Sequence, residues 1–129
     1  MITGLYAGIA AIMLVYLSFR VVGARRRNKV SLGDGGVPEL ERAMRVQANF
    51  VEYTPLLLLL LAIIEMNGLA AAGVHGLGAG VIAARVIHFI GFSSESAPFQ
   101  FRVGGAALTF LLLLGLGALV IAQSVGVLR

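Results

Sequence analysis

The chain has 129 residues, of which 59% are hydrophobic and 12% are charged, and its mean hydropathy is +0.96. A soluble domain of this length cannot bury so much apolar surface, so the composition excludes a soluble protein. The net charge of +4 does not indicate nucleic-acid binding, because half of the basic residues lie between Arg20 and Lys29, directly after an apolar stretch. Such a cluster is typical of a topology signal that contacts anionic membrane lipids.

Continuous apolar runs predict an all-α fold, an integral membrane bundle of four helices that forms one domain over residues 1–129. A β-barrel would instead show alternating apolar and polar residues. A helix needs ~20 residues to cross a bilayer, and four segments are long enough. We expect the spans at residues 1–19, 39–64, 69–90 and 103–127.

The connections between these spans differ in charge. Residues 20–38 carry five basic side chains and residues 91–102 carry Arg102, whereas the turn between the second and third spans contains Glu65. Because basic loops remain in the cytoplasm, both longer loops are expected there and both termini outside. The first span is expected to be retained, since it lacks the charged start and cleavage site of a signal peptide.

The second span begins with an unusual charged run. Its apolar block, Leu56 to Ile64, is too short to cross the bilayer alone, so a full span must include Asn49 and Glu52 and begin near Arg45. Ionisable groups in the hydrocarbon layer are costly unless they face a protein interior or a wet cavity. This run is therefore the candidate functional site.

Helical periodicity places most of these polar side chains together. At ~100° per residue, five of them fall on one arc of roughly 100°, and these are Glu41, Arg42, Arg45, Asn49 and Glu52. Glu41 and Arg45 are spaced as an i,i+4 ion pair. Gln47 points to the opposite side, toward a neighbouring helix or a second subunit.

The third span supplies further residues that would line the candidate pocket. Arg85 is expected at a depth of ~9 Å, similar to that of Arg45, and His88 and Phe92 share its helical face. With Arg102 across the loop, three arginines can converge on one pocket. Arginines hold carboxylates, while Glu52 and Asn49 can hold an ammonium or amide group.

A purely structural interpretation stays open for these residues. Arg45, Asn49, Glu52 and Arg85 can bind one another and hold the bundle together. His88 is more simply an interhelical hydrogen-bonding residue, although it is kept among the candidate ligand-binding side chains. His75, near the outer turn, is expected to be structural.

At these positions the sequence resembles the MAPEG family, the membrane-associated proteins in eicosanoid and glutathione metabolism. The resemblance rests on a run from Glu41 to Pro55 and on Ala84 to His88. The chain is similar to the bacterial branch, which implies a bacterial inner membrane, and to microsomal glutathione transferases. The matched residues of the first run are Glu41, Arg42, Arg45, Gln47, Asn49, Glu52, Tyr53 and Pro55.

The resemblance implies a homotrimer that holds glutathione between subunits on the cytoplasmic side. The residues that it implies for binding are Arg45, Gln47, Asn49 and Glu52, with Tyr53 close by, while Arg85 and Arg102 complete the anion site and are the expected catalytic residues. Arg42 and His88 are further candidates for binding. The chain has no cysteine, so any thiol must come from the substrate, and we expect no metal centre.

Arginine does not act as a base in proteins, so its role would be electrostatic stabilisation of the glutathione thiolate. The thiolate would attack a lipophilic electrophile or reduce a hydroperoxide. The family often has a tyrosine at the position of Phe92, and here that hydroxyl is absent. Two other functions remain open, namely a non-catalytic binding or scaffold protein and a transporter that uses Glu52 and His88. No repeated half or broken helix pair favours transport.

Overall fold

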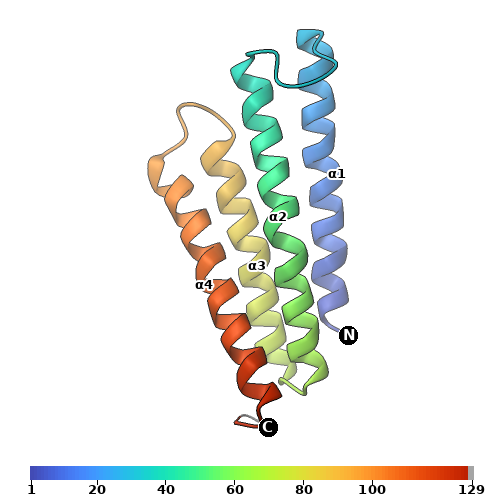
Figure 1. Ribbon diagram of the computed structural model, residues 1–129, viewed down its shortest axis with the longest axis vertical. Helices are drawn as coiled ribbons and strands as arrows, with labels where there is room; N and C mark the ends of the chain where they lie inside the picture. The colour runs from blue at the N-terminus through green and yellow to red at the C-terminus, as the bar shows by residue number, and fades with distance from the viewer. Residues whose placement is uncertain (128–129) are drawn as a thin grey trace.

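Four helices make up most of the computed structural model, which describes residues 1–127 (Figure 1). They are α1 (Thr3–Asn28), α2 (Pro38–Met66), α3 (Ala71–Phe92) and α4 (Phe99–Ser124). Each is long and apolar enough to cross a membrane, and residues 1–127 contain no strand. The prediction of an all-α membrane protein with four spans is therefore confirmed.

The four helices run up and down, so that each end of the bundle has its own character (Figure 1). Loops 29–37 and 93–98 lie at one end, which we name the two-loop end. The N-terminus, the turn at residues 67–70 and the end of α4 lie at the opposite end, which we name the terminal end.

The first helix is longer than predicted. A loop was expected from Arg20, but α1 continues through Arg25, Arg26 and Arg27 and ends where Lys29 turns into the left-handed region at a φ of 55°. Arginine and alanine are good helix formers, and cations at a helix C-terminus interact favourably with the helix dipole. The basic cluster is therefore helical, and only residues 29–37 form the loop.

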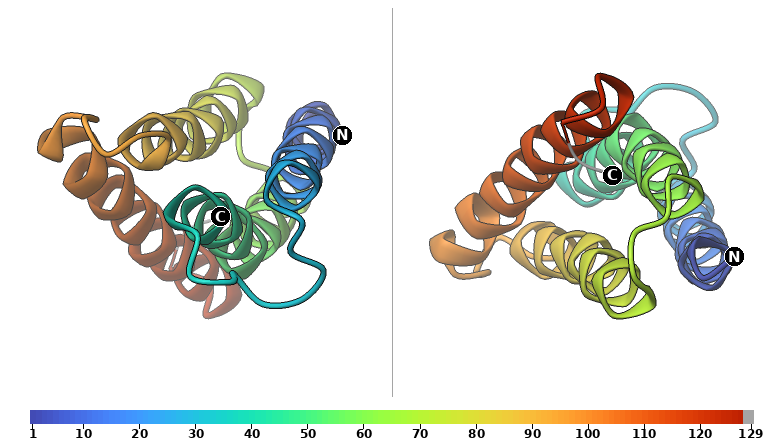
Figure 2. Two further views of the ribbon diagram at one scale, coloured as in Figure 1. Left: turned by 90° about the horizontal axis from the view of Figure 1, so that it is seen from above. Right: turned by 90° about the horizontal axis from the view of Figure 1, so that it is seen from below.

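The second helix is the centre of the bundle. It begins at Pro38, with Glu39 and Glu41 in its first turn, and Pro55 inside it does not interrupt the helix before Met66. It packs against α1, α3 and α4, whereas α1 and α4 do not contact each other within residues 1–127 (Figure 2). Residues on different faces of α2 therefore meet different partner helices.

Glycines bring α3 and α4 together at the two-loop end. A Cβ atom on Gly105 would lie 2.6 Å from the Cα of His88, and one on Gly91 would lie 2.6 Å from the backbone nitrogen of Arg102. The two helix backbones can touch only because both positions lack a side chain. Gly78 of α3 makes a further close contact, since a Cβ atom there would overlap the ring of Tyr6.

Candidate functional site

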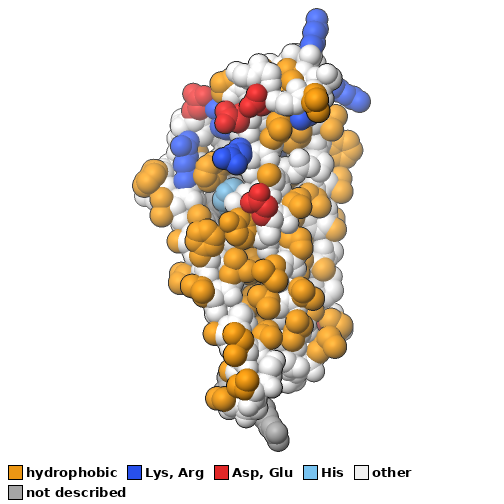
Figure 3. All heavy atoms as spheres, in the orientation of Figure 1, with side chains coloured by type: hydrophobic (Ala, Val, Ile, Leu, Met, Phe, Trp, Pro, Cys, Tyr) orange, Lys and Arg blue, Asp and Glu red, His pale blue; other side chains and the backbone are white. Residues whose placement is uncertain are grey.

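Charged side chains gather at the two-loop end of the molecule, while hydrophobic side chains cover the face below them (Figure 3). The helices that meet there supply different groups: α1 carries the basic cluster, α2 the charged run, and α3 and α4 the histidine and arginines expected opposite that run. Apart from Glu65, the charged side chains of residues 1–127 therefore lie toward one end of the four spanning helices.

A polar groove of about 270 Å³ lies between α2 and α3 near this end. Arg45, Asn49 and Glu52 come from one face of α2, where their i, i+4 and i+7 spacing aligns them. His88 and Phe92 come from α3, one turn apart. We name this the α2–α3 groove; its lining residues are Arg45, Ala48, Asn49, Glu52, His88 and Phe92.

Above this groove, Arg45 and Phe92 also line a second hollow of about 330 Å³ that reaches the loop between α3 and α4. We name it the rim hollow; it is lined by Glu41, Arg42, Arg45, Phe92, Glu95 and Arg102. Since two residues are common to both spaces, the spaces form one continuous polar surface that contains three guanidinium groups and three carboxylates.

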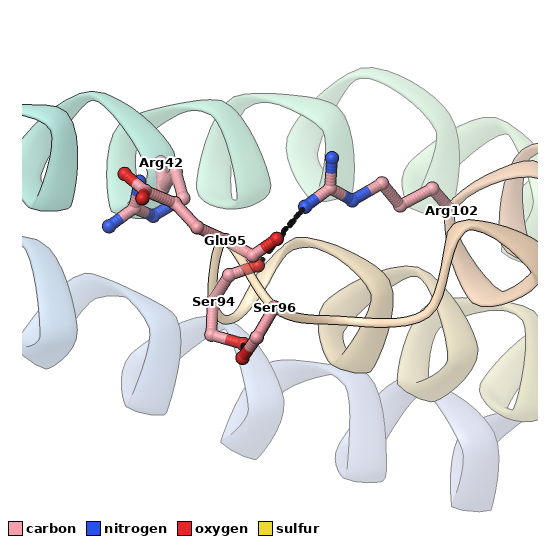
Figure 4. A network of polar contacts seen from close by, with 5 residues as sticks. All are labelled: Arg42, Ser94, Glu95, Ser96 and Arg102. Carbon is pink, nitrogen blue, oxygen red and sulfur yellow. Dashed lines mark hydrogen bonds and ion pairs between the residues drawn. The ribbon is translucent and has the colours of Figure 1, made fainter.

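The loop between α3 and α4 is tied down at this rim (Figure 4). Arg42 forms an ion pair of 2.7 Å with Glu95. Arg102 donates from Nε to the carbonyl of Gly91 at 2.8 Å, and from Nη2 to the carbonyls of Ser94 and Glu95 at 3.2 and 3.1 Å. These bonds fix the Arg102 guanidinium in place while its Nη1 makes no hydrogen bond within residues 1–127.

An apolar hollow of about 510 Å³ lies on the other side of Arg102, along α4. We name it the α4 hollow; it is lined by Phe92, Phe99, Arg102, Val103, Ala106, Ala107 and Phe110. Arg102 borders both this hollow and the rim hollow, and Phe92 borders all three spaces. The polar surface and an apolar surface on a spanning helix therefore meet at these two residues.

Arg85 does not line any of these spaces. Its side chain is 2% exposed, and it donates from Nη1 to Oδ1 of Asn49 at 2.8 Å and from Nη2 to the hydroxyl of Thr109. Arg45 and Arg102 do share the rim hollow, as expected, but the third arginine there is Arg42. Arg85 instead lies behind Asn49, inside the bundle.

His88 faces the α2–α3 groove and is 7% exposed. Its ring stacks on that of Phe92, with the centroids 4.6 Å apart and an angle of 25° between the planes. None of the hydrogen bonds among residues 1–127 includes this ring, so the expected interhelical bond of His88 is not formed there. Its imidazole nitrogens are therefore not committed to a described side chain.

Gln47 and Tyr53 lie outside the groove. Gln47 donates from Nε2 to the hydroxyl of Ser18 at 2.8 Å, which confirms that it points toward a neighbouring helix, here α1. The Tyr53 ring packs edge to face on Phe110 of α4, with the centroids 5.7 Å apart.

The prediction of an ion pair between Glu41 and Arg45 was wrong. The two ion pairs within residues 1–127 instead join Arg27 to Glu39 and Arg42 to Glu95. Both Glu41 and Arg45 are exposed, and exposed i,i+4 pairs gain too little to fix two long side chains. At the opposite end, the prediction that His75 is structural agrees with the 2.9 Å hydrogen bond between its Nδ1 atom and the Tyr6 hydroxyl.

Three residues of the site were not identified from the sequence. Thr109 accepts from Arg85, Gly105 lets α4 touch α3 beside His88, and Glu95 pairs with Arg42. Thr109 is the one hydroxyl residue between Val103 and Ala122, and that isolation in an apolar span was a usable signal. Gly105 and Glu95 carried no comparable signal, because their roles depend on contacts between helices.

Comparison with known proteins gives a consistent result. A sequence model of the MAPEG family matches residues 3–122. The chain is 39% identical over 114 residues to the inner membrane protein YecN of Escherichia coli K12. The aligned region covers 88% of this chain and 86% of the relative. YecN of E. coli O6:H1 matches with the same identity and coverage.

Proposed function

The chain belongs to the MAPEG family, and on that premise we propose that it binds glutathione, or a similar small thiol, in the α2–α3 groove and the rim hollow. It is an integral protein of the inner membrane. The bound thiolate then attacks a lipophilic electrophile or reduces a hydroperoxide. One observation carries the proposal: a polar surface with guanidinium and carboxylate groups adjoins the apolar α4 hollow at Arg102 and Phe92.

The charges of the polar surface suit a zwitterionic thiol peptide. Within residues 1–127, neither Arg45 nor Glu52 forms an ion pair, so both are available to a ligand. Arg45 is suited to a ligand carboxylate and Glu52 to its ammonium group, because hydrogen bonds between ionised groups are short and strong. Glutathione carries two carboxylates, one ammonium and one thiol, which matches this mixture.

Arg102 is the residue best placed to stabilise the thiolate. A free thiol has a pKa of ~8.5 and is mostly protonated at neutral pH, and a fixed cation near the sulfur favours the thiolate. The loop carbonyls hold the Arg102 guanidinium at the boundary between the polar surface and the α4 hollow. A thiolate beside it can reach an apolar substrate that enters from the bilayer.

The chemistry balances without a protein nucleophile. In conjugation, the thiol loses its proton to water, the sulfur forms a bond to the electrophilic carbon, and the leaving group departs with the electron pair of its bond. In peroxide reduction, the sulfur takes one oxygen to give a sulfenic acid and an alcohol. A second thiol then forms a disulfide and releases water.

The exposure of the polar residues supports an oligomer, which we propose is the homotrimer. Arg45 and Glu52 are exposed in the single chain although they lie on a spanning helix. Charges exposed to lipid are costly, so a neighbouring subunit is expected to cover this side of the groove. Chemical cross-linking in membranes is expected to give a three-subunit product as its largest species, and a limit at two subunits would contradict the trimer.

The direct test uses purified protein in lipid nanodiscs. Millimolar glutathione should raise the thermal unfolding midpoint, because a ligand that binds only the folded state stabilises it. Arg45→Ala and Glu52→Ala should each weaken binding by about tenfold or more and lower conjugation of an aryl halide. Wild-type activity equal to that of these variants would refute the enzymatic function.

A non-catalytic binding protein is the second candidate, and Phe92 favours it. Phe92 lies where the polar surface meets the α4 hollow, and it has no hydroxyl to donate to a sulfur atom. Glutathione binding without thiolate absorbance at roughly 240 nm would support this candidate, because it would mean that the site does not ionise the thiol.

A further inference from the structure

A chain of hydrogen bonds centred on Arg85 lies behind the α2–α3 groove. The hydroxyl of Thr109 donates to the carbonyl of Gly105 at 2.7 Å and accepts from Nη2 of Arg85. Nη1 of Arg85 donates to Asn49 at 2.8 Å. The chain therefore links α4, α3 and α2 in that order and ends at a residue that lines the groove.

The direction of the last bond follows from chemistry alone. A guanidinium group has only donors, so the atom of Asn49 that faces it must be the amide oxygen and not the amide nitrogen. The two ends of a side-chain amide are usually hard to distinguish, but a partner that can only donate removes that ambiguity. The NH₂ group of Asn49 is consequently turned away from Arg85.

The NH₂ group of Asn49 is available to donate a hydrogen bond into the groove. It donates to no acceptor within residues 1–127, and it is not among the buried polar atoms that lack a partner there. Asn49 therefore presents a donor to the groove, while its oxygen faces Arg85. An ammonium group would need the Asn49 oxygen, which already accepts from Arg85, whereas the NH₂ group needs an acceptor on the ligand.

We propose that Arg85 is a positioning residue that fixes Asn49 as a hydrogen-bond donor, so that Asn49 selects a carboxylate or carbonyl oxygen of the ligand. This inference rests on the proposed binding of glutathione. Arg45 and Asn49 then form the part of the groove that binds acceptors, and Glu52, one turn further along α2, forms the part that binds an ammonium group. The ligand is thereby oriented along α2, with its carboxylate toward the two-loop end.

Burial explains why Arg85 can impose this orientation. Its side chain is 2% exposed and its Nε atom has no partner, so moving the guanidinium away from Asn49 would leave a further buried donor unsatisfied. An unsatisfied buried donor is costly, particularly on a charged group. Rotation of the Asn49 amide would have the same result, because it would place two donors against each other.

The substitution Asn49→Asp separates positioning from simple helix packing. An aspartate has the same shape and accepts from Arg85 with an added charge, so the bundle should keep or raise its thermal unfolding midpoint. It has no N–H to offer the groove, however, and its charge repels a carboxylate. We expect glutathione to bind about tenfold more weakly or worse, measured by isothermal titration in nanodiscs.

Asn67→Asp is the matched control. Asn67 donates to Gln123 at the terminal end, so this variant makes the same chemical change far from the groove. Its affinity for glutathione should stay within about twofold of wild type.

Arg85→Met and Arg85→Lys complete the test, because lysine still donates to the Asn49 oxygen and methionine does not. Lysine should restore most of the binding that methionine loses.

Each result has a definite meaning. Weak binding by Asn49→Asp with an unchanged midpoint supports the positioning role. Binding by Asn49→Asp within about twofold of wild type overturns it, and so does a folded Arg85→Met variant that binds normally. If wild-type protein itself shows no binding, the proposed function fails first. That outcome is distinct from a wild-type protein that binds and an Asn49→Asp variant that binds equally well.

Discussion

The two ends of the bundle differ in how many of their functional polar side chains have a partner. At the terminal end, the carboxylate of Glu65 accepts from the backbone N–H groups of Ile2 and Thr3, and the Tyr6 hydroxyl bonds to the ring and carbonyl of His75. At the two-loop end, Arg45 and Glu52 face a groove without an ion-pair partner in residues 1–127. Satisfied polar groups hold the fold, and unsatisfied ones beside a groove indicate a binding site.

This comparison predicts that the ends fail differently when they are mutated. Changes at the terminal end should lower stability and leave ligand binding intact in the protein that remains folded. Changes in the groove should weaken ligand binding and leave stability intact. A mutation at a contact that packs the helices and also borders the groove should lower both stability and ligand binding. The close approach of α3 and α4 beside His88 is such a contact.

The largest effect is expected for Gly105→Val. A Cβ atom there would lie 2.6 Å from the backbone of His88, so the two helices must separate. Forcing atoms into a packed contact costs about 1–3 kcal/mol and sometimes more, and the groove would widen. We expect a large fall in the unfolding midpoint together with loss of glutathione binding. Gly104→Ala is the control, since the nearest atom to its Cβ is 3.9 Å away; equal effects would refute the contact.

A smaller effect, on stability alone, is expected for Glu65→Gln. A neutral amide oxygen accepts more weakly than a carboxylate from the N–H groups of Ile2 and Thr3, and it no longer opposes the positive end of the α1 dipole. The unfolding midpoint should fall by about 5 °C while glutathione affinity stays unchanged. Weakened binding at a normal midpoint would show that the two ends are not independent.

Phe92→Tyr should change the chemical step rather than the fold. A hydroxyl at the junction of the groove and the α4 hollow can donate to the thiolate, so kcat/KM for conjugation should rise about tenfold. Phe89→Tyr is the control, because Phe89 faces Tyr16 and Arg20 of α1. An unchanged rate in Phe92→Tyr, with binding intact, would favour the non-catalytic function.

The smallest effect is expected for Glu95→Gln. The exposed carboxylate of Glu95 pairs with Arg42 on the rim, so it competes with a ligand carboxylate for that guanidinium. Removing the competitor should tighten glutathione binding about threefold, as expected for a surface ion pair. Glu39→Gln breaks the other exposed ion pair, with Arg27, and should leave the affinity unchanged. Weaker binding by Glu95→Gln would mean that the pair supports the site.

Much of the fold could be predicted because hydropathy and span length depend on each helix alone. The four spans follow from this property, and so does the shared face of Arg45, Asn49 and Glu52. The end of α1 does not follow from charge, because the arginines that indicate a loop also have a high helical propensity.

The remaining errors concern contacts between helices. Arg85 was expected beside Arg45, since depth and helical spacing place both near one level, but these quantities do not show which way the guanidinium turns. It turns inward because Asn49 and Thr109 offer acceptors there. The close approach at Gly105 was missed for a similar reason, as many glycines in these spans make no close contact.

The buried guanidinium of Arg85 also has a consequence for biosynthesis. Its two acceptors come from α2 and α4, and the chain is made in order from α1 to α4. When α3 enters the membrane, Asn49 is already available, but Thr109 is not. A nascent chain that ends after α3 therefore holds an intramembrane cation with one of its two partners missing. The arrival of α4 supplies the second acceptor, so the guanidinium of Arg85 has both partners only in the complete bundle.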